Sequence, residues 1–473
     1  MRITNFGGNL TFEPQTYFAP KSEQEVLEIL ASCKGRRIRV IGRLHSWSEA
    51  PQGDDVLMDL KHLNEVRMEE REGVTWATIQ GGCQVKRAIA ELDQAGVTLP
   101  SLGLITEQSI AGAAATGTHG SGKNSMAHYV DEATIATYDT ETGEPTIRTV
   151  SSGPELLAVR CSLGCLGVIL SVGIRCRAQY YVEEHLRIYS DTSELLAAEE
   201  QYPLQQFLLV PHFWKIIAQH RRVVDRRRSL LAPLYRIYWL VAVDFGLHLI
   251  LLAMVRWLRS RPLVRFFYRR VLPIALLRGF KVVDKSQHIL TMEHELFRHI
   301  EIEVFVRRSK VCDALEYVRQ LLDYTDGKES CIAESTWQRL EESDRADSVR
   351  QTKGIYTHHY PICVRKILPD ETFISMASSV DEPYYSISFV NYNRPSERES
   401  FLKFANILAQ TTADLFQARP HWGKFCPIDA QTARQLYPRL NEFRDICNTA
   451  DPNGVFRNPW IDTVIFDTDR SMS

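Results

Sequence analysis

The sequence predicts an α+β protein of two domains, and three observations support this. Its 473 residues suffice for about two or three domains of ordinary size. Residues 1–178 alternate helical and strand-like segments with glycines at strand ends, whereas residues 179–420 carry long strand-like runs separated by amphipathic helices. A content of 44% hydrophobic and 24% charged residues excludes a disordered or fibrous protein.

The first domain begins with a helix followed by a short strand. Ser22 and Glu25 form a capping box, in which the hydroxyl and the carboxylate each bind a backbone N–H at the start of the helix. Residues 39–41 then read as a strand that runs directly into Gly42. Further predicted segments are a strand over 74–79, a helix over 84–95, a stretch of small residues over 103–122, and strands over 132–138 and 167–176.

The second domain has four strand-like runs and two long helical ones. The strands are predicted near 180–188, 300–307, 359–367 and 384–392, and the helices over 310–322 and 397–417. The C-terminal segment is rich in turn residues and ends in a strand-like run over 463–466. We therefore expect an antiparallel sheet with helices packed on it, followed by a short tail.

One stretch of the second domain, residues 215–280, is both basic and apolar. It holds 14 Lys and Arg but only two acids, Asp225 and Asp244, although the whole chain has a net charge of −2. Residues 237–255 contain a single charged side chain. This pattern favours association with an anionic membrane surface over nucleic-acid binding, while a membrane-spanning helix and an insertion that packs on the protein's own body remain alternatives. The arginines expected near lipid head groups are Arg221, Arg222, Arg226, Arg227 and Arg228, followed by Arg256, Arg259, Arg261, Arg265, Arg269 and Arg270.

The N-terminus and the cysteines indicate the compartment. The first residues lack the apolar core of a signal peptide. The ten cysteines include no CxxC pair and no Cys/His spacing typical of a metal site. We therefore expect free thiols in a reducing compartment, no metal, and membrane association from the cytoplasmic side.

Two loops carry residues suited to a phosphate-containing ligand. The first follows the strand over 39–41 and contains Gly42, His45 and Ser46. Backbone N–H groups of such a glycine turn can bind phosphate oxygens, and the histidine could be a ligand, a base, an attachment point or a structural residue. The second, residues 108–122, is built of small residues that let the main chain approach a ligand closely, although a tight helix–sheet contact would favour the same composition.

These loops resemble the flavin-binding half of the vanillyl-alcohol-oxidase superfamily, and most closely that of the aldonolactone oxidases (gulonolactone and arabinonolactone oxidases) and alditol oxidase. Residues 42–46 match the family's Gly-x-x-His-Ser loop, residues 115–122 match Ala-Thr-Gly-Thr-His-Gly-x-Gly, and residues 163–169 match a third flavin-contacting segment. Residues 420–424 match Pro-His-Trp-x-Lys, and residues 451–458 match the closing turn. The matches follow the family's order over nearly the whole chain.

The resemblance implies a two-subdomain FAD-binding domain of the PCMH type over 1–178 and an antiparallel-sheet cap over 179–420 that binds the substrate. Residues 421–473 would return to the FAD-binding domain, and the insertion near 215–280 would belong to the cap, as in the membrane-bound gulonolactone oxidases. FAD would be attached covalently to His45, with tight non-covalent binding as the alternative. The resemblance assigns to the cofactor Gly42, Arg43, Leu44, His45, Ser46, Gly103, Ser109, Gly112, Thr116, Gly117, Thr118, His119, Gly120, Ser121, Gly167, Ile169, His421 and Lys424.

In this family a substrate CH–OH group gives a hydride to flavin N5, and a base or a cation accommodates the hydroxyl proton. The resemblance assigns this work to a Pro-x-Glu-x-Arg strand and to the lysine of the C-terminal motif. Arg365 and Lys424 are retained, but Cys363 stands in place of the glutamate. A thiolate stabilised by the two cations could act as the base, or Cys363 could only fill volume. Two further candidates for substrate contact are Tyr392, where alditol oxidase has a histidine, and Glu303.

The resemblance thus implies an FAD-dependent oxidoreductase that acts on a sugar-derived substrate, most like an aldono-1,4-lactone such as D-arabinono-1,4-lactone. Its partners would be a sugar lactone or polyol, a membrane surface, and oxygen or a redox carrier as the electron acceptor, with no nucleic acid. Two alternatives remain. The substrate could be a membrane-embedded lipid-linked sugar or sterol, given the basic apolar stretch, or the protein could bind flavin without turnover, given Cys363.

Overall fold

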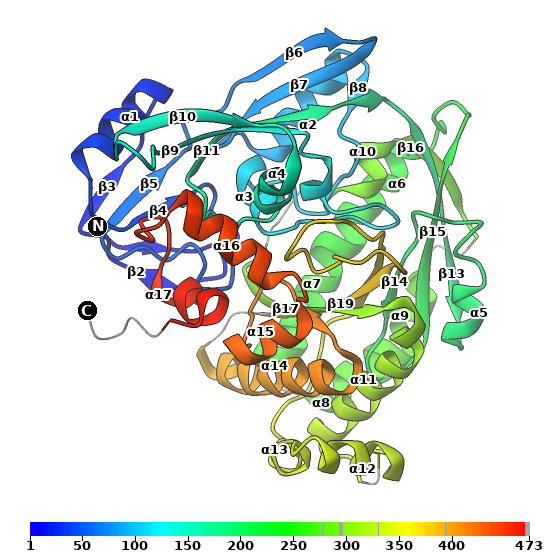
Figure 1. Cartoon of the computed structure of the whole chain (residues 1–473). Helices are drawn as coiled ribbons and strands as arrows, with labels where there is room; N and C mark the ends of the chain where they lie inside the picture. The colour runs from blue at the N-terminus through cyan, green and yellow to red at the C-terminus, as the bar shows by residue number, and fades with distance from the viewer. Residues whose placement is uncertain (259, 277–278, 293–296, 330, 393–394, 469–473) are drawn as a thin grey trace.

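The computed structural model describes residues 1–258, 260–276, 279–292, 297–329, 331–392 and 395–468. Its first domain is built on two main sheets (Figure 1), to which the described residues add two short two-stranded ones. The smaller sheet is parallel and has α1 beside it, with the order β3 (Thr16–Phe18), β5 (Val56–Asp59), β4 (Ile38–Ile41) and with α1 over Glu23–Ser32. The capping box forms as predicted, because the Glu25 amide donates to the Ser22 hydroxyl at 3.2 Å and the Glu25 carboxylate accepts from the Lys21 amide at 2.8 Å.

The larger sheet of the first domain is antiparallel. Its order is β10 (Pro145–Val150), β9 (Glu132–Tyr138), β11 (Val168–Arg175), β7 (Val74–Gln80), β6 (Val66–Arg71), and its helices are α2 (Val85–Gln94), α3 (Ile110–Ala115) and α4 (Gly153–Arg160). The small residues of α3 let it lie close to the sheet, where the Ile110 and Ala111 amides donate to the carbonyls of Cys83 and Gly81.

The cap is built on an eight-stranded antiparallel sheet. Its order is β16 (Lys281–Lys285), β13 (Tyr181–Tyr189), β15 (Ile216–Val224), β14 (Gln206–Leu209), β18 (Ile362–Ile367), β19 (Tyr384–Tyr392), β17 (His299–Arg307), β20 (Arg419–Pro420). Apolar residues such as Phe207, Ile302 and Phe389 face α11 (Val311–Thr325) and α14 (Pro395–Phe416). Because side chains alternate along a strand, the neighbours of these residues face the opposite side, where the sheet is polar.

The C-terminal segment packs on the first domain. It consists of α15 (Ala430–Leu436), α16 (Leu440–Ala450), α17 (Pro459–Ile461) and the helical turn η6 (Asp462–Phe466), red in Figure 1. Trp422 and Phe443 share an apolar core with Ile79 of β7. The strand predicted over 463–466 is wrong. The Asn458 side chain accepts from the Ile461 amide at 2.9 Å and Pro459 follows it, and this pair starts a helix.

The stretch 215–280 is not a single insertion. Its first residues form β15, between β13 and β14 inside the cap sheet, so the insertion begins only after Val224. Two helices follow, which we call the first and second insertion helices. The first comprises α6 (Ala232–Tyr238), η2 (Trp239–Leu247), α7 (His248–Leu252) and η3 (Ala253–Trp257), and the second comprises α8 (Arg261–Phe266), η4 (Phe267–Val271) and α9 (Leu272–Ala275). Within the described residues, one helix, Ala232–Val255, has the length and composition to cross a membrane, with a mean hydropathy of 2.0 and 18% of its most apolar window buried.

Most of the arginine cluster predicted to contact lipid instead pairs within the cap. Arg221 is buried against Glu184, and Arg222 lies 2.8 Å from Glu183, because β15 and β13 place opposite charges across from each other. Further pairs join Arg226 to Glu183 at 3.6 Å and Arg228 to Asp284 at 2.9 Å. The side chains of Arg256, Arg259 and Arg261 lie outside the described part of the chain.

Short elements complete the described structure: β1 (Ile3–Thr4), β2 (Thr11–Phe12), β8 (Val97–Thr98), η1 (Met126–Tyr129), β12 (Arg177–Ala178), α5 (Thr192–Leu196), α10 (Ser286–Leu290), η5 (Arg308–Lys310), α12 (Glu334–Glu342) and α13 (Ala346–Arg350). The two short sheets pair β1 with β2 and β8 with β12.

Candidate functional site

A channel runs through the first domain where its glycine loops meet the C-terminal motif. Most of the predicted cofactor residues line it: Gly42, Arg43, Leu44, His45, Ser46, Ser109, Gly112, Thr116, Gly167, Ile169, His421 and Lys424. Main-chain bonds hold its wall together, since the Trp47 amide donates to the Gly423 carbonyl at 2.9 Å and the Ser48 hydroxyl donates to the Trp422 carbonyl at 2.6 Å. Segments far apart in the sequence therefore form one surface.

At two glycines, the main chain itself forms the wall of the channel. A Cβ at Gly42 would lie 1.9 Å from the Ser109 hydroxyl oxygen and 2.6 Å from the Ser109 Cβ. A Cβ at Gly112 would meet only that hydroxyl, at 3.0 Å, so bare main chain faces the channel there. Together with the nearby hydroxyls and the Arg43 guanidinium, this surface suits a dinucleotide that carries a pyrophosphate, and the lining therefore fits FAD.

His45 lies in the channel wall together with the C-terminal motif. Its ring stacks on Phe6, with the ring centroids 4.7 Å apart. Burial, which outweighs the nearby Glu107 carboxylate, lowers the pKa of His45 to about 4. The imidazole is therefore neutral at neutral pH, the form in which a ring nitrogen keeps a nucleophilic lone pair.

Six predicted cofactor residues do not line the channel. Two of them, Thr118 and His119, line the cavity next to it, and the other four line neither: Gly103, Gly117, Gly120 and Ser121. Gly117 turns the chain with φ of +72°, Gly120 packs so closely that a Cβ would lie 2.2 Å from a neighbouring carbonyl, and the Ser121 hydroxyl donates to a cap carbonyl. Their role is to tighten the loop that presents Thr118 and His119, which face the cavity next to the channel.

That cavity has a volume of about 580 Å³ and lies under the polar face of the cap sheet. Gln108, His421 and Lys424 line both the channel and the cavity, so the two are neighbours. Its polar lining comes from alternate residues of the cap strands: Glu184, Gln206, Gln219, Arg221, Glu301, Glu303, Cys363, Arg365 and Ser388. Much of its apolar lining comes from the first insertion helix: Ile237, Trp239, Leu240, Val243 and Leu247. The volume is that of an ordinary small-molecule site.

Glu301 and Lys424 form a buried ion pair at the boundary between cavity and channel. Lys424 Nζ lies 2.5 Å from Glu301 Oε2, and Ser388 also donates to this carboxylate. Strand β17 positions the C-terminal Pro-His-Trp-x-Lys motif, because the His421 and Phe425 amides donate to the Glu303 and Glu301 carbonyls at 2.9 Å. Burial alone would raise the pKa of Glu301, but the Lys424 ammonium and His299 together outweigh it and the pKa falls to about 2.

Glu303 lies two residues further along β17 and faces the same cavity. Its Oε1 is 3.2 Å from His119 Nε2 and 3.9 Å from Arg365 Nη1. His119, Glu303 and His421 offer donor atoms within 4.8 Å of one another, a spacing that a metal ion could also accept. The neighbouring Arg365 and Lys424 cations oppose a further positive charge there.

A third buried ion pair, between Glu184 and Arg221, fastens the first insertion helix to the sheet. Tyr235 of α6 donates to Glu184 at 2.6 Å, and this carboxylate also accepts from Arg221. All three side chains line the cavity. The helix is therefore held as a wall of the cavity by polar contacts as well as by packing.

Cys363 lines the cavity, but its environment does not favour a thiolate. Burial raises the pKa of Cys363, and the nearby Arg365 guanidinium does not offset that effect. The Glu301 and Glu303 carboxylates oppose a further negative charge. The thiol is therefore neutral at neutral pH, which favours the alternative that Cys363 fills volume over that of a thiolate base.

Tyr392 is buried beside the cavity and does not line it. Its hydroxyl lies 2.8 Å from Nδ1 of His248, and Tyr360 holds the other ring nitrogen of His248 at 3.1 Å. His248 does line the cavity. The structure places Tyr392 against His248 of the first insertion helix, outside the cavity lining, which favours a packing side chain over one in direct contact with the substrate.

Sequence reasoning missed Glu301, Glu184 and Arg221. A signal was present for Glu301, because the run Ile300–Val304 alternates apolar and acidic residues and so places two carboxylates on one face of a strand. For Glu184 and Arg221 the signal was weaker, since the segment with Arg221 reads as part of a basic surface until β15 is paired with β13.

The chain is similar to known proteins over nearly its full length. Residues 181–464 match the family described as D-arabinono-1,4-lactone oxidase, and residues 14–144 match an FAD binding domain. A long-chain alcohol oxidase from an uncultured marine euryarchaeote is 49% identical over 456 residues, covering 96% of this chain and 95% of that protein. The L-gulonolactone oxidase of Scyliorhinus torazame is 24% identical and covers 98% of each chain.

A solved structure shares the fold at low identity. The cholesterol oxidase from B. sterolicum aligns with a TM-score of 0.73 at 16% identity, over 98% of this chain and 96% of that chain. Its likeness shows the arrangement of an FAD-binding domain and an antiparallel-sheet cap. With the matches above, the chain belongs to the D-arabinono-1,4-lactone oxidase family, within the FAD-dependent oxidases of the vanillyl-alcohol-oxidase superfamily.

Proposed function

We propose that this FAD-dependent enzyme oxidises the terminal hydroxyl of a long-chain, mainly apolar alcohol. The observation that carries the proposal is the two-sided cavity, which sets carboxylates and cations beside the channel and apolar side chains along the first insertion helix. A polar head and an apolar tail would each meet matching groups. The relative that is 49% identical is named for the same substrate class.

FAD bound in the channel supplies the hydride acceptor. On the protein side, the Glu301 carboxylate would accept a hydrogen bond from the substrate hydroxyl and take its proton, and Arg365 would stabilise negative charge that develops on the oxygen. When Glu301 is protonated, the Lys424 ammonium 2.5 Å away loses its counter-charge. Its positive charge is then available in the wall that it shares with the channel.

We also propose that His45 carries FAD covalently. A neutral buried imidazole in the channel wall supports this. The test is flavin fluorescence in the protein band of a denaturing gel, with His45→Ala beside the wild type. Fluorescence in the wild type alone is the expected result, whereas a dark wild-type band with flavin in the supernatant would mean non-covalent binding.

An aldono-1,4-lactone is the second candidate substrate. The cavity offers Gln206, Gln219, Arg221 and Glu184, which is more hydrogen-bonding capacity than one hydroxyl needs. A polyhydroxylated ring would use these groups. The matched family is also named for such a lactone.

Anaerobic flavin reduction separates the candidates. The oxidised enzyme is mixed with long-chain primary alcohols in detergent, short-chain alcohols, aldonolactones and alditols, and the loss of flavin absorbance is followed in a stopped-flow instrument. Fast reduction by long-chain alcohols supports the proposal, and fast reduction by lactones alone overturns it. Flavin that no alcohol or lactone reduces would instead indicate a flavin-binding protein without this turnover. Reoxidation by oxygen or by an artificial acceptor then identifies the class of electron acceptor.

A further inference from the structure

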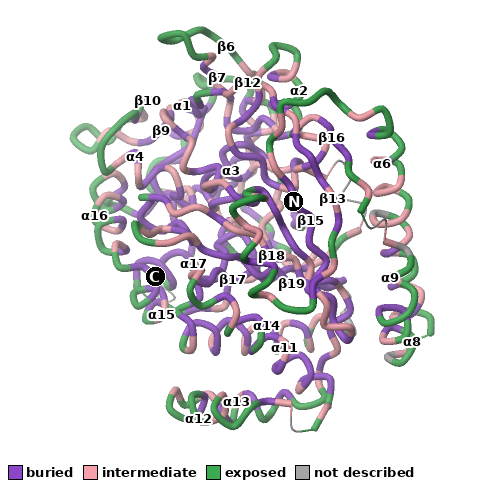
Figure 2. The backbone as a smooth tube through the Cα atoms, turned by 90° about the vertical axis from the view of Figure 1, so that its right-hand side faces the viewer, coloured by how far each residue is buried: buried purple, intermediate pink, exposed green. Residues whose placement is uncertain are grey.

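The first insertion helix exposes a continuous apolar stripe. The side chains follow one another at spacings of three and four and are each at least 41% exposed: Leu234, Ile237, Val241, Phe245 and Leu249, with Ile237 at the border between this stripe and the cavity lining. This spacing places them on one face of the helix. An ordinary surface helix turns such a face toward the core, whereas Figure 2 shows α6 along the edge of the molecule with much of its length exposed.

The opposite stripe of the same helix lines the cavity. Tyr235, Trp239, Val243 and Leu247 recur every four residues and all face the cavity. A single helix therefore separates the cavity from the surroundings of the protein. The apolar residues on the outer side do not pack in the core of the protein. We therefore expect them to contact another apolar surface.

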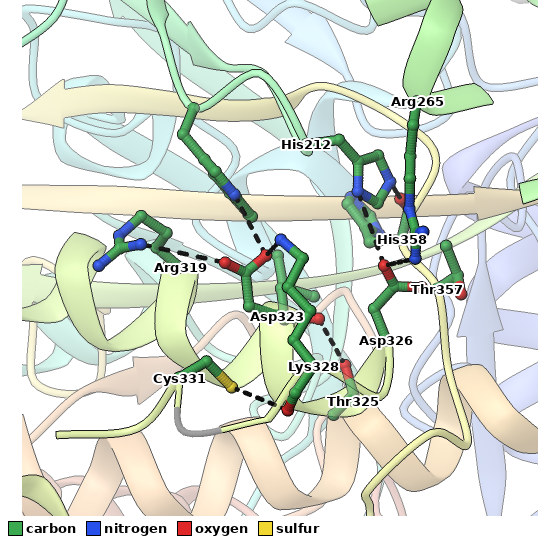
Figure 3. A network of polar contacts seen from close by, with 12 residues as sticks. His212, Arg265, Arg319, Asp323, Thr325, Asp326, Lys328, Cys331, Thr357 and His358 are labelled. Atoms are coloured by element: carbon green, nitrogen blue, oxygen red, sulfur yellow. Dashed lines mark hydrogen bonds and ion pairs between the residues drawn. The ribbon is translucent and has the colours of Figure 1, made fainter. Parts of the chain in front are cut away.

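The second insertion helix also turns polar side chains toward the protein and apolar side chains outward. Polar groups anchor it inward, because Arg265 pairs with Asp326 (Figure 3) and Tyr268 donates to the His359 carbonyl at 2.7 Å. His212 lies against the same carboxylate, with Nδ1 3.9 Å from Asp326 Oδ2. The large apolar side chains that remain exposed on this helix and the preceding turn are Trp257, Leu258, Leu263, Phe266, Val271 and Ile274.

The described charges around the two helices are mainly positive. Among the described side chains of residues 225–275, the exposed charged ones are one acid, Asp225, and five arginines: Arg226, Arg227, Arg228, Arg269 and Arg270. Arg226 and Arg228 also pair with cap carboxylates, but cations remain in excess. Cations that border an apolar surface complement the anionic head groups and the acyl region of a bilayer. A tryptophan such as Trp257, which is 77% exposed, is typical of the membrane interface.

We propose that the outer faces of the two insertion helices dock on the surface of a bilayer that contains anionic lipids, and that the alcohol enters the cavity from that bilayer past the first insertion helix. Tyr235 and His248 hold this helix on the cap sheet, which favours docking over spanning. Docking stands independently of the substrate, and the entry route rests on the proposed function.

Docking is tested with the full-length holoenzyme and sedimented vesicles of phosphatidylcholine alone or mixed with phosphatidylglycerol. The test variant is Leu234→Asp/Val241→Asp/Leu249→Asp, whose positions are 62%, 60% and 55% exposed and do not line the cavity. The matched control is Met68→Asp/Val74→Asp/Val380→Asp, at positions 40%, 41% and 85% exposed elsewhere on the protein.

The wild type and the control should bind the anionic vesicles, and the test variant should bind at least about tenfold more weakly. Equal binding by the test variant overturns the proposal. A second result also overturns it: neither protein binds vesicles, and light scattering shows a wild-type dimer but a monomeric test variant. The stripe would then contact a second copy of the chain. If neither high salt nor alkaline extraction releases the wild type from the vesicles, surface docking is overturned in favour of a membrane-spanning helix.

Delivery is tested by flavin reduction with a long-chain alcohol embedded in the vesicles and with the same alcohol in detergent. The test variant should lose at least about tenfold in rate with vesicles and keep the wild-type rate in detergent. If the wild type binds vesicles but no alcohol reduces it in either medium, docking holds and the proposed function fails. Equal rates for both proteins from vesicles overturn the entry route.

Discussion

The channel and the cavity lie side by side in this protein, but they are built in different ways. The channel is made of consecutive residues in a few loops, and its main contacts are main-chain atoms and small side chains. The cavity takes one or a few residues each from six cap strands, from the first insertion helix and α10, and from the loops beside them. A backbone site needs a fixed run of residues and so leaves a motif in the sequence, whereas a side-chain site can draw the same group from any neighbouring strand.

Cys363 illustrates the difference. It stands on β18 where the family motif has a glutamate, yet the cavity is not short of carboxylates. Cys363 is opposite Ser388 of β19, which is opposite Glu303 of β17, and Ser388 also donates to Glu301. The cap thus supplies acidic groups from two strands away, which a loop built from backbone could not do.

The largest effect is expected for the channel variant Gly42→Ala. Its Cβ would lie 2.6 Å from the Ser109 Cβ, so rotation of the hydroxyl gives no relief and the loop must shift. We expect loss of most bound flavin and a destabilisation of about 1–3 kcal/mol. The control Gly73→Ala lies in the β6–β7 turn at φ of +78° with no atom within 4 Å, so it strains the backbone without entering the channel wall and should keep its flavin. Flavin absorbance per protein decides between them, and a fully loaded Gly42→Ala enzyme would contradict the backbone description of the channel.

The next effect is expected for Glu301→Gln in the cavity. Loss of the proton acceptor should slow flavin reduction by about 10²–10⁴-fold with flavin content unchanged. Because the pKa of Glu301 is about 2, the carboxylate stays ionised well into the acid range, and this group should give the wild type no acid limb near neutral pH. Glu199→Gln, another ion-paired cap carboxylate that does not line the cavity, is the control. Equal rates for the two variants would remove Glu301 from the chemistry.

A smaller effect is expected for the two faces of the first insertion helix. Leu240→Asp puts a charge into the apolar lining and should lower kcat/KM for a long-chain alcohol in detergent by about tenfold to hundredfold, with little change for a short-chain alcohol. Leu234→Asp changes the outer face and should leave both values unchanged in detergent. An equal loss for both alcohols in Leu240→Asp would show that the tail does not lie along this helix.

The smallest effect is expected for Cys363→Ser. Because burial keeps the thiol neutral, a neutral hydroxyl of similar size should change the rate of flavin reduction by less than about threefold. The pH profile should also keep its wild-type shape. A loss of a hundredfold or more would restore the thiolate hypothesis and place the base on β18 after all.

Much of the fold was predictable because it depends on local patterns. The capping box at Ser22, four of the eight strands of the cap (β13, β17, β18 and β19) and the helices over 311–325 and 395–416 follow from periodicity and end signals. The element most clearly misread was β15. Its arginines lie in a run that is basic overall, and only the pairing with Glu183 and Glu184 shows that the run enters the sheet.

The sequence by itself determined the cofactor site and the two-domain organisation, because glycine loops and alternating strands require particular residues at fixed spacings. It also placed the basic apolar segment, although not its role. Only the tertiary structure decided which carboxylates meet Lys424 and Arg365, that Tyr392 contacts His248, and that one helix is both the wall of the cavity and an exposed apolar face. The reason is physical: the charge, burial and partners of a side chain are set by strands and helices that lie far apart in the sequence.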